Sequence, residues 1–238
     1  MNGTLLALLL GALVAGLGGL LVPRLIASVP EPQPKQATDE PPKMLYADIA
    51  ARPGLALRSA LVSAAAGGVL GAATGLDWPL LWLVPLTPVA VALSVVDWHT
   101  RLLPRVVVVP ATLATLAAVV VVGLATGERS ALLWALGGMV GLRSFFWLLW
   151  FIRSAGMGFG DVRLAALVGL VLGWAGADVL LFGAWIGFVS FALPGLALAI
   201  VRRDKSLLKK PFPYGPFMVG GALVGLVWGT AIAGGLWG

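Results

Sequence analysis

The sequence predicts an all-α, polytopic integral membrane protein, and two observations support this prediction. First, 60% of the 238 residues are hydrophobic and only 11% are charged, with a mean hydropathy of +1.00, which is outside the usual range of soluble domains. Second, apolar runs follow one another along the chain, separated by Pro, Gly and charged residues. Most of these runs approach the roughly 20 residues that a helix needs to cross the apolar core of a bilayer.

Eight of these runs are expected to be membrane-spanning helices. Their approximate bounds are 3–22, 56–76, 80–96, 106–125, 131–152, 161–176, 178–201 and 217–237. The first run is followed, not preceded, by positive charge, whereas a cleavable signal peptide carries its positive charge before the apolar region. We therefore interpret 3–22 as a retained anchor.

The chain divides into two predicted parts. Residues 1–55 form the anchor and a short linker, and residues 56–238 form a membrane-embedded domain. Ser28–Lys43, within the linker, is rich in Pro and charge, so we expect an extended cytoplasmic tether there.

The net charge of +6 is explained by orientation in the membrane. The basic residues fall in short loops between apolar runs and not along one soluble stripe, which argues against nucleic acid as a partner. If the loop after the first helix is cytoplasmic, nearly all Lys and Arg residues lie on that side, as the positive-inside rule requires. Both termini are then predicted to be non-cytoplasmic.

The chain contains no cysteine and a single histidine, His99. Structural disulfides and thiolate zinc sites are therefore excluded. Because a metal site needs several ligands, we interpret His99 as an interfacial loop residue rather than a metal ligand.

Two aspartates adjoin long apolar runs on the predicted cytoplasmic side. Asp97 follows the third run, and Asp161 opens the sixth. Two carboxyl groups brought together at that depth cannot both ionise cheaply, so they tend to share one proton near neutral pH. An aspartic protease uses this arrangement to activate water and to protonate the developing oxyanion. The helix dipole favours an anion at Asp161, which makes Asp161 the preferred base and Asp97 the preferred acid.

Three glycines precede the second aspartate, at Gly156, Gly158 and Gly160. Residues without a Cβ allow an extended substrate backbone to approach a carboxylate closely, so all three are candidate substrate-binding positions. The alternative is that they form a turn or allow close helix packing.

Together these stretches resemble the type IV prepilin peptidases, polytopic aspartic proteases of the GxGD class. Gly158-Phe-Gly-Asp161 matches one family motif, and Asp97 with Pro104 matches the other. The stretch "KKPFPYGPFMVGGAL" (209–223) resembles the family's last cytoplasmic loop and helix.

The resemblance implies an endopeptidase that cuts type IV prepilins or pseudopilins after a short basic leader, using Asp97 and Asp161. It places the protein in the bacterial inner membrane, with the active site facing the cytoplasm, and it requires no metal. Oligomeric state is not implied.

The N-terminal third departs from many family members. They carry paired zinc-binding cysteines there and methylate the new N-terminus with S-adenosylmethionine, whereas this chain has no cysteine. We therefore expect cleavage without methylation, and S-adenosylmethionine as a cofactor only if methylation is retained.

The rival interpretation is a small proton-coupled transporter that uses the same acidic residues. Transporters place such acids near the midplane and contain paired repeats, whereas these two acids are predicted at the inner interface. Two further basic residues also fall in apolar runs. Arg143, in the middle of a run, is expected to line a polar cavity, and Arg163 to contact lipid headgroups.

Overall fold

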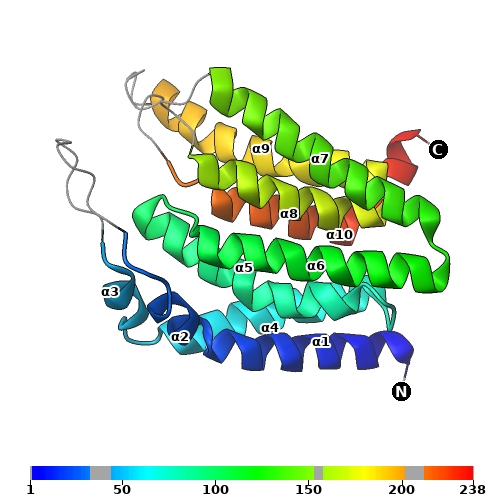
Figure 1. Cartoon of the computed structure of the whole chain (residues 1–238), viewed down its shortest axis with the longest axis horizontal. Helices are drawn as coiled ribbons and strands as arrows, with labels where there is room; N and C mark the ends of the chain where they lie inside the picture. The colour runs from blue at the N-terminus through cyan, green and yellow to red at the C-terminus, as the bar shows by residue number, and fades with distance from the viewer. Residues whose placement is uncertain (1, 33–43, 153–157, 202–211, 238) are drawn as a thin grey trace.

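The protein is a bundle of long helices, seen here in a computed structural model that describes residues 2–32, 44–152, 158–201 and 212–237. The long helices within these ranges are α1 (Gly3–Leu20), α4 (Leu55–Thr74), α5 (Leu80–Thr100), α6 (Arg105–Thr126), α7 (Arg129–Ile152), α8 (Phe159–Ala175), α9 (Ala177–Val201) and α10 (Gly215–Trp237). They run back and forth along one axis (Figure 1). Their bounds lie close to those of the eight predicted runs, and the all-α prediction is confirmed.

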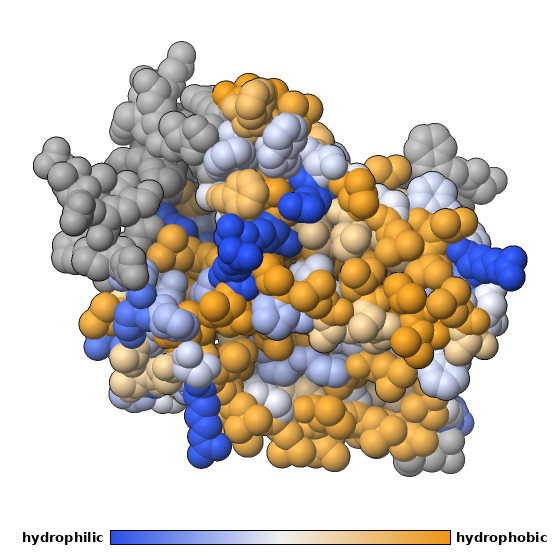
Figure 2. Space-filling model, viewed as in Figure 1, coloured by the Kyte–Doolittle hydropathy of each residue, from blue (hydrophilic) through white to orange (hydrophobic). Residues whose placement is uncertain are grey.

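Within the described ranges, six helical segments are long and apolar enough to cross a membrane. They are α1, α4, α5, α6, α7 and residues Ala177–Pro194 of α9. Large apolar side chains on their outer surfaces are exposed, among them Leu124 and Leu133 at 69% each, and Figure 2 shows a largely hydrophobic face. Such a surface fits lipid, and the protein is an integral membrane protein. The count of eight spans stays a prediction.

Among the described residues between α1 and α4 there are two short helices that were not predicted from the sequence. They are α2 (Val22–Ala27) and α3 (Tyr46–Ala50). The Glu31 carboxylate accepts hydrogen bonds from the backbone N–H groups of Tyr46 and Ala47, at 2.7 and 2.8 Å, and so begins α3. Residues 33–43 of the predicted tether lie outside the described residues.

Helix α8 forms the centre of the bundle. Nearly all of its residues from Asp161 to Gly173 are buried, and it packs against α6, α7, α9 and α10. Glycines face neighbouring helices in the closely packed pairs α1–α4, α7–α8 and α9–α10. Small residues at such interfaces let helix backbones approach closely, which drives association in membranes.

The two ends of the bundle differ in charge. Helix α1 begins and α10 ends at the right of Figure 1, whereas α5 ends and α8 begins at the left. The left end carries Arg52, Arg58, Arg101 and Arg105, whereas Asp77, Glu128 and Asp178 lie in the turns of the other end. Which end faces the cytoplasm stays a prediction.

Candidate active site

Asp97 lies in the last turn of α5, inside the helix rather than after it. The helix ends at Thr100 because Arg101 adopts the left-handed conformation (φ 55°), with its N–H donating to the Asp97 carbonyl at 2.8 Å. Such a residue ends many helices. The Asp97 side chain is only 4% exposed.

Asp161 is the third residue of α8. Gly158 precedes the helix in an extended conformation, and its carbonyl accepts the Asp161 N–H at 3.1 Å. The carboxyl group thus lies in the first turn, where the helix dipole favours negative charge. Its side chain is 8% exposed.

The structure brings these two carboxyl groups together. They come from opposite ends of their helices but from the same end of the bundle, and they are close enough for the charge of one to act on the other. Leu103, in the turn between α5 and α6, is in close contact with Gly160, so the start of α8 is held against the end of α5. This contact brings together the two helix ends that carry the carboxyl groups.

A third segment, residues 212–216, contacts Asp97 and lies within electrostatic range of Asp161. The Gly215 N–H donates to Asp97 Oδ2 at 2.8 Å. The next residue back, Tyr214, is buried, and its burial together with the negative charge of Asp161 raises the pKa of Tyr214. Tyr214 therefore keeps its proton beside Asp161 over the whole physiological range.

The tyrosine ring is held by other aromatic rings. It packs against Phe146 of α7 and Phe191 of α9, with ring centroids 5.5 and 4.9 Å away. Neither Tyr214 nor Gly215 was predicted from the sequence as a site residue, although both lie in the stretch that carries part of the family resemblance. The available signal in the sequence was the turn-forming stretch Pro-Tyr-Gly-Pro. Such a stretch has no hydrophobic periodicity, so it could not indicate contact with an aspartate more than 100 residues away.

The predicted glycines differ in their surroundings. Gly156 lies outside the described residues. A Cβ on Gly158 would meet Asp161 Oδ2 at 3.7 Å, an ordinary contact, whereas a Cβ on Gly160 would lie 2.8 Å from Leu103 Cβ. The close contact of Gly160 with Leu103 fits the packing alternative considered for these glycines, and substrate contact at Gly158 and Gly160 stays a prediction.

The other residues singled out in the sequence, His99, Arg143 and Arg163, are not part of the carboxyl pair. His99 is in the last turn of α5, not in a loop; its Nδ1 lies 2.8 Å from the Val95 carbonyl, and its Nε2 contacts Arg52. Arg143 and Arg163 line a separate cavity between α6, α7 and α8.

The site offers paired carboxyl groups and a neutral phenol, which is the chemistry of proton exchange with a bound water or substrate. Within the described ranges, no group of three or more His, Asp or Glu side chains is arranged to hold a metal ion. The carboxyl pair is thus the principal chemical feature of this end of the bundle.

Comparison with known proteins identifies the family that this site resembles. Residues 84–195, which include both aspartates, match the model of the type IV leader peptidase family. The resemblance to the type IV prepilin peptidases is therefore confirmed. No solved structure matches the chain significantly.

Several curated relatives carry the same name, prepilin leader peptidase/N-methyltransferase. The protein from Aeromonas hydrophila is 32% identical over 189 residues, covering 78% of this chain and 61% of the relative. That from Pseudomonas putida is 33% identical over 64% of this chain and 51% of the relative. The chain thus spans about half to three fifths of the length of these relatives.

We expect alanine to be tolerated at Gly158 but not at Gly160. Gly160→Ala forces Leu103 to shift, at a cost of about 1–3 kcal/mol, which lowers the Tm by roughly 3–10 °C. Gly158→Ala meets only ordinary contacts, so its Tm stays within about a degree of the parent. Thermal unfolding in detergent measures both variants, and equal Tm values for the two would contradict the packing role of Gly160.

Proposed function

We propose that this protein is an aspartic endopeptidase of the bacterial inner membrane that removes the short basic leader from type IV prepilins or pseudopilins. The observation that carries the proposal is the buried pair Asp97 and Asp161 at one end of the bundle. The names of the curated relatives support prepilin processing. The basic residues at the same end support a cytoplasmic active site, by the positive-inside rule.

In the proposed reaction, the ionised carboxylate takes a proton from a water molecule, and the water oxygen attacks the carbonyl carbon of the peptide bond. The protonated carboxyl group donates to the carbonyl oxygen as it gains negative charge. The C–N bond then breaks as the first carboxyl group passes the proton it took from water to the departing nitrogen. A hydroxyl proton of the tetrahedral intermediate returns to the second carboxylate, so that the new carboxylic acid forms and both groups regain their starting states. Asp97 and Asp161 are the proposed catalytic residues.

The Gly215 hydrogen bond bears on which carboxyl group is ionised. An N–H that donates to Asp97 Oδ2 stabilises the anion of Asp97. This favours Asp97 as the base and Asp161 as the acid, the reverse of the assignment preferred from sequence. Because the two groups titrate as a pair, the proton is best described as shared between them.

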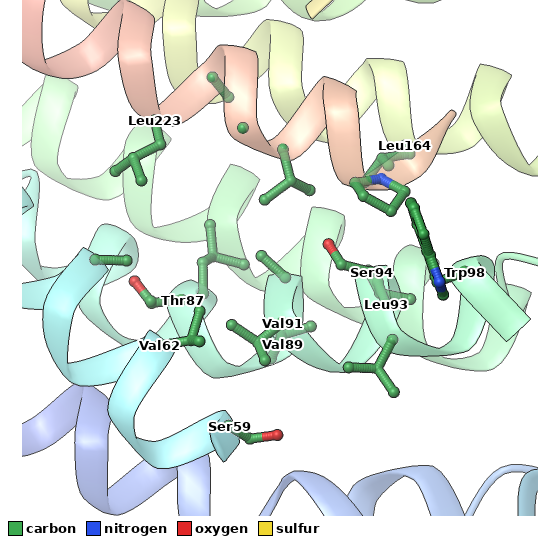
Figure 3. Close-up of a pocket in the computed structure, with 18 of the residues that line it drawn as sticks. Ser59, Val62, Thr87, Val89, Val91, Leu93, Ser94, Trp98, Leu164 and Leu223 are labelled. Carbon is green, nitrogen blue, oxygen red and sulfur yellow. The ribbon is translucent and has the colours of Figure 1, made fainter. Parts of the chain in front are cut away.

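We further propose that the hydrophobic helix of the prepilin, which follows the cut, lies in an apolar groove beside the aspartates. The groove has a volume of about 580 Å³ and runs between α4, α5, α8 and α10. Figure 3 shows Thr87, Ser94 and Trp98 along α5, between Val62 of α4 and Leu223 of α10.

Residues that line this groove lie within one helical turn of the site residues in the sequence. The lining includes Ser94, one turn before Asp97, Leu164, one turn after Asp161, and Pro216, next to Gly215. An apolar helix in the groove would thus have its polar end beside the carboxyl groups.

The proposed cleavage uses no metal and no cofactor, because the carboxyl groups supply both base and acid. Methylation with S-adenosylmethionine is not part of the proposal. The relatives' names include it, but this chain covers only part of their length and has none of the cysteines that accompany it in many members.

Asp97→Asn and Asp161→Asn are each expected to lower prepilin cleavage by about 10²- to 10⁴-fold, because either change removes an acid or base from the pair. The assay uses inverted membrane vesicles mixed with a prepilin, with the product detected by mass. The matched control is Asp178→Asn, an exposed aspartate in the first turn of α9 at the other end of the bundle.

That control is expected to cleave at the parental rate. In right-side-out vesicles, cleavage of added prepilin is expected only after the vesicles are opened. If both Asn variants cleave normally, the carboxyl mechanism is wrong, and if only right-side-out vesicles cleave, the cytoplasmic assignment is wrong.

Filling the groove is expected to slow cleavage without unfolding the protein. A Cβ at Gly220 meets no atom within 4 Å and projects from a residue that lines the groove. Gly220→Phe should therefore lower kcat/KM about tenfold or more, equivalent to about 1.4 kcal/mol. Gly137→Phe on α7, where a Cβ also meets nothing within 4 Å, is the control. Equal kinetics for the two variants would exclude the groove as the substrate site.

A further inference from the structure

Three arginines from three helices line one cavity on the outer side of α8. Arg105 is the first residue of α6, Arg143 lies in the middle of α7, and Arg163 is the fifth residue of α8. The cavity has a volume of about 680 Å³ and is bounded by α6, α7 and α8. Figure 2 shows hydrophilic side chains grouped within a mostly hydrophobic face over these helices.

The three guanidinium groups repel one another. The charges of Arg105 and Arg143 both act unfavourably on the charge of Arg163, which also packs over the Phe159 ring at 4.8 Å. The largest influences on the charge of Arg163 are its burial and these two like charges, with no acidic group among them. Uncompensated positive charge in a low-dielectric region is costly, so the cluster fits a negatively charged ligand.

The position of the cavity indicates where that ligand comes from. Arg143 lies nine residues before the end of α7 at Ile152, which is roughly 14 Å along the helix axis. Beside the arginines the lining turns apolar, with Leu113 and Val140 exposed by 58% and 59%. The cavity therefore opens sideways on the face that contacts lipid.

We propose that this cavity binds the phosphate group of an anionic phospholipid, with Arg105, Arg143 and Arg163 around the phosphate and the acyl chains along Leu113 and Val140. Guanidinium groups bind phosphate oxygens through paired, charge-assisted hydrogen bonds. An anionic lipid adds negative charge where three positive charges meet. A zwitterionic lipid instead brings its own cation, which the arginines repel.

Lipid binding here would act on the candidate active site through a single helix. Arg163 and Asp161 are two residues apart in the first turns of α8. A phosphate bridging Arg163 to α6 and α7 holds the start of α8 in place. This is a positioning effect, and binding itself does not depend on the proposed peptidase activity.

The test measures lipid binding to the purified full chain in detergent by native mass spectrometry. Phosphatidylglycerol is expected to bind at least tenfold more tightly than phosphatidylcholine. Arg143→Gln should weaken phosphatidylglycerol binding about fivefold, because one basic residue contributes about 1 kcal/mol near an anionic lipid. Arg105→Gln is the second variant. Arg129→Gln, an exposed arginine at the opposite end of α7, is the matched control and should bind as the parent does.

Thermal unfolding distinguishes a lipid-binding role of these arginines from a merely structural role. Without anionic lipid, Arg143→Gln should raise the Tm because it relieves repulsion, whereas with phosphatidylglycerol the parent should gain more Tm than the variant. Equal lipid binding by Arg143→Gln, Arg105→Gln and Arg129→Gln would overturn the proposal. If inorganic phosphate at millimolar concentration competes with the lipid, the proposed lipid ligand is wrong and the cavity is a site for the free anion.

Discussion

The burial of two carboxyl groups side by side is the constraint on which the rest of this structure depends. Two adjacent negative charges in a low-dielectric region repel strongly, so the fold has to supply favourable partners. The Gly215 N–H donates to Asp97, Asp161 lies at a helix N-terminus, and Tyr214 retains its proton beside it. The segment with Tyr214 and Gly215 lies far along the chain from α5, and it meets the start of α8 and the end of α5 at one end of the bundle.

Close packing between helices makes that meeting possible. Gly160 lets the start of α8 contact Leu103, and the aromatic rings of Phe146 and Phe191 hold Tyr214 between α7 and α9. Such packing, rather than a water-excluded core, stabilises helix bundles in membranes.

Local patterns in the sequence predicted the long helices well, because the length of an apolar run alone nearly determines where a membrane helix begins and ends. The predicted run 161–176 corresponds to α8 (Phe159–Ala175), and both aspartates were placed at one end of the bundle by counting helices. The partners Tyr214 and Gly215 were not predicted as site residues. Arg143 was predicted to line a polar cavity, but its grouping with Arg105 and Arg163 in one cavity was not predicted. These arrangements arise from contacts between segments far apart in the sequence, and the hydrophobic periodicity of one segment does not indicate such contacts. The short helix α3 was missed because Glu31, fifteen residues away from Tyr46, begins it.

The central claim is that the ends of α5 and α8 hold Asp97 and Asp161 next to each other. The chain has no cysteine, so Asp97→Cys combined with Asp161→Cys gives a clean test with a short bifunctional thiol reagent. The account predicts an internal cross-link, detected by mass, in the folded double variant and none when Asp161→Cys is replaced by Asp178→Cys. A folded double variant whose two thiols react separately, without a cross-link between them, would contradict the account.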